Sequence, residues 1–107
     1  MKKIEAVVRT IKIHEIQHQL IKIGIPTFSI YQVQITGIHE GLKNKTSDYI
    51  PKLKIEILCA DKDEDKVINA IQKAGQFGEK GDGVIFTYDI NKLVKIRTAE
   101  VGESALQ

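Results

Sequence analysis

The chain lacks three features that would each point to a broad class of protein. Its single cysteine, Cys59, excludes an internal disulfide framework and fits a reducing compartment. Its 16 basic and 14 acidic residues are mixed along the chain, so it lacks the electrostatic footprint of a nucleic-acid-binding protein. It also has no apolar run long enough for a signal peptide or a membrane-spanning helix. We therefore expect a cytoplasmic protein with no nucleic-acid partner and no membrane insertion.

The length and composition predict one small domain over residues 1–107. Apolar residues make up 42% of the chain, enough for a core, and charged residues make up 28%. A domain of this size leaves a large share of its surface uncovered unless it associates with another molecule. The composition is therefore compatible with an oligomer.

Hydrophobic periodicity predicts four strands and two helices. The chain order is a strand over residues 3–9, a helix with the apolar stripe Ile13, Ile16, Leu20 and Ile23, strands over residues 27–35 and 50–58, a helix with the apolar face Val67, Ile68, Ile71 and Ala74, and a strand from Val84, followed by residues 94–98. Asp61 and Glu64 have the spacing of a capping box before the second helix.

This β-α-β-β-α-β order predicts the α+β, ferredoxin-like fold, an antiparallel sheet with two helices on one face. The sequence offers no third helix for the other face, yet the strand over residues 27–35 is apolar on both sides. A homo-oligomer that buries the bare face is the simplest solution.

Two segments between these elements are candidates for function. Residues 37–48 carry glycines, polar residues and alternating charges, and are long for a hairpin connection, so we predict a mobile functional loop. Residues 78–83, with the sequence GEKGDG, place three glycines in six positions. Such a run can cradle a phosphate with backbone N–H groups, or it can be only a tight helix-to-strand turn.

Residues 14–18, with the sequence HEIQH, match the H-E-x-x-H pattern of zinc proteases. The apolar stripe of the same helix leaves His14 and His18 facing solvent, and the remaining histidine, His39, lies in the predicted loop. Cys59 lies in a strand with no activating partner in the sequence, which favours a core position over a nucleophile. We therefore expect neither a metal site nor an enzyme, and keep a metallopeptidase as the weakest alternative.

The whole length resembles the PII family of trimeric signal-transduction proteins. The segments that carry the resemblance are MKKIEA (residues 1–6), PKLKIEI (51–57), VINAIQKA (67–74), GDGVIF (81–86) and IRTAE (96–100), with Gly102 and Glu103. They occur in the order of that family, and the resemblance covers nearly all of residues 1–105. The resemblance implies three functional segments, a flexible T-loop over residues 37–50, a phosphate-binding B-loop over residues 77–83 and a C-terminal segment over residues 95–107.

PII proteins bind adenylyl nucleotides in the clefts between neighbouring subunits, so the resemblance implies a homotrimer with ADP, AMP and ATP as ligands and no covalent cofactor. The implied nucleotide-binding residues are Gly37, Gly81, Asp82, Gly83, Arg97, Lys95, Ser29, Glu56 and Leu58. The implied small-anion or partner-loop residues are His39, Lys52, Glu40 and Gly41.

The chain departs from the family at several of these places. Val84 replaces the usual lysine after Gly-Asp-Gly, Lys95 replaces an arginine, and Phe77 replaces a threonine. Fewer and less directional cations weaken phosphate recognition, so we predict that ADP or AMP binds at least as well as ATP. The T-loop is shorter than usual, and Lys45 stands where the uridylylated tyrosine would be, with Tyr49 at the start of the next strand.

These features predict a regulator that senses nucleotides and controls a membrane transporter or metabolic enzyme through residues 37–50, in nitrogen or inorganic-carbon metabolism. The small anion is 2-oxoglutarate in the first case and bicarbonate in the second. A bicarbonate-responsive, carboxysome-associated PII-like protein is one alternative, and a ligand-free trimeric scaffold, favoured by Val84 and Phe77, is another.

Overall fold

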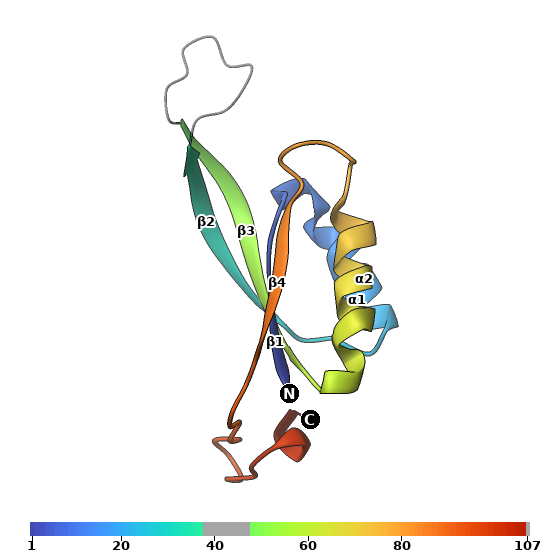
Figure 1. Cartoon of the computed structure of the whole chain (residues 1–107), viewed down its shortest axis with the longest axis vertical. Coiled ribbons are helices and arrows are strands. Elements are labelled where there is room, and N and C mark those ends of the chain that lie inside the picture. Colours follow the sequence, from blue (N-terminus) through green and yellow to red (C-terminus); the bar gives the residue numbers. More distant parts are fainter. Residues whose placement is uncertain (38–47, 107) are drawn as a thin grey trace.

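The computed structural model describes residues 1–37 and 48–106 (Figure 1). Its elements are, in order, β1 (Lys2–Val8), η1 (Thr10–Lys12), α1 (Ile13–Lys22), β2 (Ser29–Gly37), β3 (Asp48–Cys59), η2 (Asp61–Asp63), α2 (Glu64–Gly75), β4 (Gly83–Asp89) and η3 (Glu103–Leu106). The four strands form one sheet in the order β2-β3-β1-β4, with every neighbouring pair antiparallel. Both α-helices cover the same face of this sheet (Figure 1). The predicted ferredoxin-like βαββαβ fold is confirmed.

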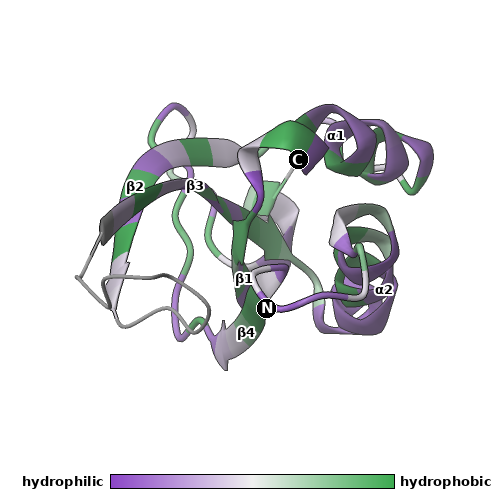
Figure 2. Cartoon of the chain, turned by 90° about the horizontal axis from the view of Figure 1, so that it is seen from above, coloured by the Kyte–Doolittle hydropathy of each residue, from purple (hydrophilic) through white to green (hydrophobic). Residues whose placement is uncertain are grey.

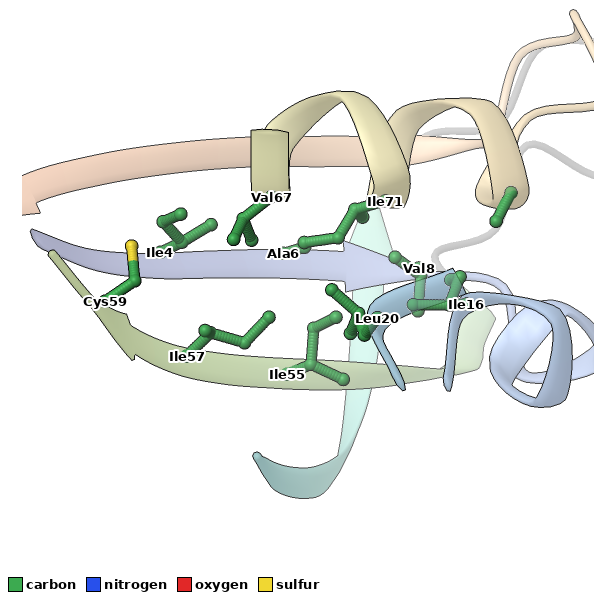
Figure 3. Packing of buried hydrophobic residues seen from close by; sticks show 11 residues of the cluster. Ile4, Ala6, Val8, Ile16, Leu20, Ile55, Ile57, Cys59, Val67 and Ile71 are labelled. Carbon is green, nitrogen blue, oxygen red and sulfur yellow. The ribbon is translucent and has the colours of Figure 1, made fainter. Parts of the chain in front are cut away.

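The hydrophobic core lies between the sheet and the two helices (Figure 3). Because side chains alternate along a strand, every second residue of β1 and β3 points to the helices. The buried cluster is Ile4, Ala6, Val8, Ile16, Leu20, Ile55, Ile57, Cys59, Val67, Ile71 and Ala74. The apolar stripes predicted for the helices therefore face the sheet, and their outer sides are largely hydrophilic (Figure 2).

Cys59 is 3% exposed and belongs to this core. Burial raises the pKa of its thiol, and the nearby carboxylates of Asp63 and Glu64 raise it further. A thiol in such surroundings stays protonated and is a poor nucleophile. The interpretation of Cys59 as a core residue is confirmed.

The other face of the sheet has no helix over it in the part of the chain that the structure describes. Its centre holds charged side chains in pairs, with Lys3 Nζ 2.8 Å from Glu56 Oε1 and Lys54 Nζ 2.8 Å from Glu5 Oε1. The exposed apolar side chains of this face are Tyr31, Ile35, Leu58, Val84, Phe86 and Tyr88. The predicted bare face is therefore present, and it combines an ionic centre with an apolar surround.

The hairpin strands differ from the prediction in two ways: β3 (Asp48–Cys59) is longer than the predicted residues 50–58, and β2 (Ser29–Gly37) is shifted by two residues from the predicted residues 27–35. Their pairing continues through Ile35 with Ile50 and Thr36 with Tyr49 to Gly37 with Asp48. Of the loop predicted over residues 37–50, Gly37 and residues 48–50 are thus paired strand, because ladder hydrogen bonds persist beyond the last strongly β-forming residues. Tyr49 lies in β3, near its start, as predicted. Residues 38–47 lie outside the described part of the chain.

The predicted capping box is wrong. The chain enters α2 through the η2 turn, so the helix begins at Glu64, and its N-cap Asp63 makes no side-chain capping hydrogen bond. Asp61 Oδ1 instead accepts from the Met1 amino group at 2.7 Å, and Glu64 Oε2 accepts from the Thr87 hydroxyl at 2.8 Å. Both carboxylates therefore bond to groups that are distant in sequence, and neither caps the helix.

Residues 94–98 form no strand of the main sheet. A single antiparallel bridge joins Val94 to Val101. None of the described helices is both long and apolar enough to cross a membrane.

Candidate ligand site

The loop over residues 77–83 joins α2 to β4 and is organised around the carboxylate of Asp82. Asp82 Oδ2 accepts hydrogen bonds from the backbone N–H groups of Phe77 at 3.0 Å, Gly78 at 2.9 Å and Glu79 at 3.3 Å. Gly78 and Gly81 have φ of 87° and 97°, which let the backbone aim these groups inward. The amides of the loop therefore do converge on an anion, and in the free chain that anion is Asp82 itself.

Arg9, which the sequence analysis did not single out, is the main side-chain partner of this loop. Its Nε donates to Asp82 Oδ1 at 3.1 Å, and its Nη2 donates to the Lys80 carbonyl oxygen at 2.9 Å. Burial opposes the ionisation of Asp82, but the hydrogen bonds from Gly78, Arg9, Phe77 and Glu79 outweigh it and hold the pKa of Asp82 below its ordinary value. Arg9 could have been found from the pairing of β1 with β4, because Gly83 pairs with Val8, the residue before Arg9.

Lys52 lies beside the same loop. Its Nζ donates to the Gly81 carbonyl oxygen at 2.6 Å. Burial lowers the pKa of Lys52, and the positive charge of Arg9 lowers it further. A pocket of about 390 Å³ opens next to it, with the lining residues Val7, Ile35, Ile50, Lys52, Gly81, Gly83 and Val84. This end of the sheet thus combines a glycine-rich loop, the cations of Arg9 and Lys52, and an aliphatic wall, with Gly37 at the end of the neighbouring strand.

A second group of predicted site residues lies toward the opposite end of the sheet. Ser29 pairs with Glu56 across β2 and β3, and Leu58 follows on β3. They line a pocket of about 290 Å³ together with Thr27, Phe28, Leu93, Ala105 and Leu106. The Lys3 ammonium and then the Tyr31 hydroxyl, which donates at 2.6 Å, hydrogen-bond Glu56 and lower its pKa to about 2.

The C-terminal segment that carries Lys95 and Arg97 folds into a tight turn at the same end. The Lys95 N–H donates to the Glu100 carbonyl oxygen at 2.9 Å, and the Ala99 N–H donates to the Lys95 carbonyl oxygen at 2.8 Å. Ala99 has a φ of 61°, which closes the turn. Ile96 at its tip is fully exposed, and Arg97 is exposed beside it. The turn projects from the body of the molecule (Figure 1).

One chain therefore divides the predicted nucleotide-binding residues into two groups that do not meet. Gly81, Asp82 and Gly83 lie at the end of the sheet where Gly83 pairs with Val8, whereas the C-terminal segment follows the end where Asp89 pairs with Lys2. Six strand steps separate these pairs, about 20 Å at the usual rise of a strand. Figure 1 shows the loop after α2 and the C-terminal segment at opposite ends.

The remaining predicted positions have different outcomes. His39, Glu40, Gly41 and Lys45 lie outside the described residues. His14 and His18 are exposed on α1, as predicted from the apolar stripe. Within residues 1–37 and 48–106, no three His, Cys, Asp or Glu side chains come together as potential metal ligands.

The Glu56 cluster predicts a dependence of stability on pH. Its folded pKa of about 2 lies below the ordinary value of 4.5, so its ionised pairing stabilises the fold fully above pH 4.5 and loses that contribution as the pH falls toward 2. We expect the Glu56 side-chain carboxyl, followed by carbon-detected NMR, to titrate near pH 2 in the parent protein. Replacing its first partner, Lys3→Met, should move the midpoint toward 4.5. A parent midpoint near 4.5 would contradict the cluster.

Comparison with known proteins gives one consistent family. The model of the family described as Nitrogen regulatory protein P-II matches residues 1–100. Proteins of that name from Pasteurella multocida and Pyropia yezoensis are 35% and 38% identical to the chain, and each alignment covers 99% of this chain and 100% of the relative.

A solved structure supports the same assignment. The crystal structure of Arabidopsis thaliana PII bound to citrate superimposes with a TM-score of 0.83 at 32% identity, covering 99% of this chain and 89% of that one. The chain therefore belongs to the P-II family of nitrogen regulatory proteins.

Proposed function

We propose that this P-II protein is a homotrimer that binds adenylyl nucleotides in the clefts between its subunits. The observation that carries the proposal is the separation of the two groups of site residues at opposite ends of one chain. A neighbouring subunit can bring its Arg97 and Glu56 end to the loop end of the first chain and complete a site that one chain leaves open.

The bare sheet face supports the trimer independently. Exposed aromatic and aliphatic side chains gathered on one face are typical of a surface that another protein copy covers, and the charges at the centre of this face are already paired within the chain. Three sheets facing a common axis would bury these faces together. Trimerisation and ligand binding are thus two consequences of one assembly.

The charges at the loop end favour a ligand with few phosphates. Val84 supplies no cation, and Arg9 is already bonded to Asp82 and to the Lys80 carbonyl oxygen. Lys52 is bonded to the Gly81 carbonyl oxygen. Since charge-assisted hydrogen bonds are the strong contacts to phosphate, a third phosphate gains little here. ADP or AMP should bind at least as well as ATP.

The regulatory output is assigned to residues 37–50, which run from the last residue of β2 into the start of β3 and dock on a membrane transporter or metabolic enzyme. Lys52, at the base of this segment, is the anchor for a small anion, with His39, Glu40 and Gly41 as further contacts. We propose that this small anion is 2-oxoglutarate. If the chain is instead a carboxysome-associated PII-like protein, the anion is bicarbonate. That the similar Arabidopsis protein was solved bound to citrate supports including carboxylates among the ligands tested.

Calorimetric titration of the purified protein with ATP, ADP and AMP tests the nucleotide proposal. We expect saturable heats for each, with ADP or AMP no weaker than ATP, and a mass corresponding to three chains in the same sample. No heat and no thermal shift at millimolar nucleotide would reject the sensor. A trimer that binds none of the three would instead support the alternative of a ligand-free scaffold, which Val84 and the self-occupied loop amides favour.

A further inference from the structure

Phe77, the first residue of the glycine loop, is 53% exposed, and two cations lie over its ring. The Arg9 Cζ atom is 5.2 Å from the centre of its ring, and the Lys12 Nζ atom is 4.1 Å from it. Both cations come from the connection between β1 and α1, far from Phe77 in sequence. Cations within about 6 Å of an aromatic face are attracted by its negative charge density. The ring therefore ties the start of the loop to the η1 turn.

The Arg9 guanidinium extends this link along the whole loop. It contacts the Phe77 ring at the start, bonds the Lys80 carbonyl oxygen in the middle and bonds the Asp82 carboxylate near the end. The Asp82 carboxylate in turn binds the N–H of Phe77. Arg9, Phe77 and Asp82 thus form a closed circuit, to which the Lys80 carbonyl is bonded through Arg9. A planar guanidinium can stack on an aromatic ring while the N–H groups in its plane hydrogen-bond to other partners.

Lys12 is fixed as the second cation. Its Nζ lies 3.4 Å from Glu15 Oε2, one turn further along α1, and this ion pair directs it over the ring. The Phe77 contact therefore joins the loop to a helix end that is itself packed into the core through Ile16.

We propose that Phe77, Arg9 and Lys12 form a cation–π clamp that holds residues 77–83 in their ligand-binding conformation before any ligand arrives, with Phe77 as a positioning residue. A loop ordered in advance loses less conformational freedom on binding, so the clamp raises affinity without touching the ligand. The effect on affinity rests on the proposed nucleotide function. The ordering of the ligand-free loop does not rest on that function, and it can be measured without any ligand.

The test compares Phe77→Leu, which keeps apolar bulk but removes the ring, with Phe77→Tyr, which keeps the ring. Hydrogen exchange by NMR in ligand-free protein reports the protection factors of the Gly78 and Glu79 amides. For two lost cation–π contacts at an exposed site we expect Phe77→Leu to exchange roughly fivefold to thirtyfold faster and to bind ADP more weakly by a similar factor. Phe77→Tyr should restore both values. Phe77→Leu should unfold a few degrees below the other two proteins, because it loses contacts made only in the native state, but the NMR shifts of its core residues should stay the same, because Phe77 lies outside the core.

Ile11→Ala is the matched control, since Ile11 is 76% exposed on the same turn and should leave the exchange unchanged. Equal protection in the parent and Phe77→Leu would overturn the clamp, as would equally fast exchange in Phe77→Leu and Phe77→Tyr. Faster exchange with unchanged ADP affinity would overturn its role in binding. Faster exchange in a protein whose parent binds no ADP would support the clamp while rejecting the proposed function.

Discussion

The Gly83→Ala variant is expected to lose more than about 3 kcal/mol of unfolding free energy, because strain and a backbone clash add at one position. Gly83 has a φ of 105°, and an added Cβ would lie 1.8 Å from the Val7 carbonyl oxygen. That oxygen belongs to β1, beside the Val8–Gly83 pair, so relief requires the β1–β4 ladder to open. Urea unfolding followed by circular dichroism measures the loss.

Gly78→Ala is the matched control for this variant. Gly78 has a φ of 87°, but nothing lies within 4 Å of its added Cβ. Its substitution should cost only the left-handed backbone term, about 1 kcal/mol. Equal stability of the two variants would show that β1 does not approach Gly83 closely. Gly83→Ala is therefore unsuitable as a test of phosphate contacts, because the substitution disturbs the sheet before any ligand is present.

The second large effect is expected at Arg97. Arg97→Ala should weaken ADP binding roughly ten- to hundredfold, the usual cost of a lost charge-assisted hydrogen bond. Asp82→Ala should weaken it at least as much, because the loop loses the carboxylate that gathers three of its N–H groups. Arg97→Lys, which keeps the charge, is the control and should lose less. Isothermal calorimetry with ADP measures all three.

Mixing the Arg97→Ala and Asp82→Ala chains distinguishes a site shared between two subunits from a site within one chain. If each cleft takes Arg97 from one subunit and Asp82 from its neighbour, random trimers made from equal amounts of both variants regain about a quarter of the intact clefts. Calorimetry on the co-refolded mixture should then show tight binding at that fraction of the parent stoichiometry. No recovery would place both groups in one chain, and parent-like binding by Arg97→Ala would show that the C-terminal segment takes no part.

Regular elements could be predicted from the sequence because their signal is local. The spacing of Ile13, Ile16 and Leu20 needs only the period of a helix, and the alternation of Ile4, Ala6 and Val8 needs only the period of a strand. The structure confirms both patterns in the core. The resemblance to the PII family, carried by separated segments in order, likewise depends on the sequence alone and is confirmed over residues 1–100.

Contacts between distant segments could not be predicted in this way. Asp61 and Glu64 have the spacing of a capping box, yet the Met1 amino group and the Thr87 hydroxyl take their carboxylates. The end of β2 at Gly37 depends on its partner Asp48 in the next strand. Contacts of this kind leave no periodic pattern in the sequence. A local motif such as the capping box can therefore be present while its side chains bond to distant residues instead.

The sequence by itself determined the fold class, the two-sided character of the sheet and the glycine loop as the candidate site, since each follows from residue type and spacing. Only the tertiary structure decided that Arg9 reaches across to Asp82, that Asp82 fills the amides of its own loop, and that Arg97 lies at the far end of the sheet. Charges interact through space over a few ångströms, and only folding sets which of them come that close.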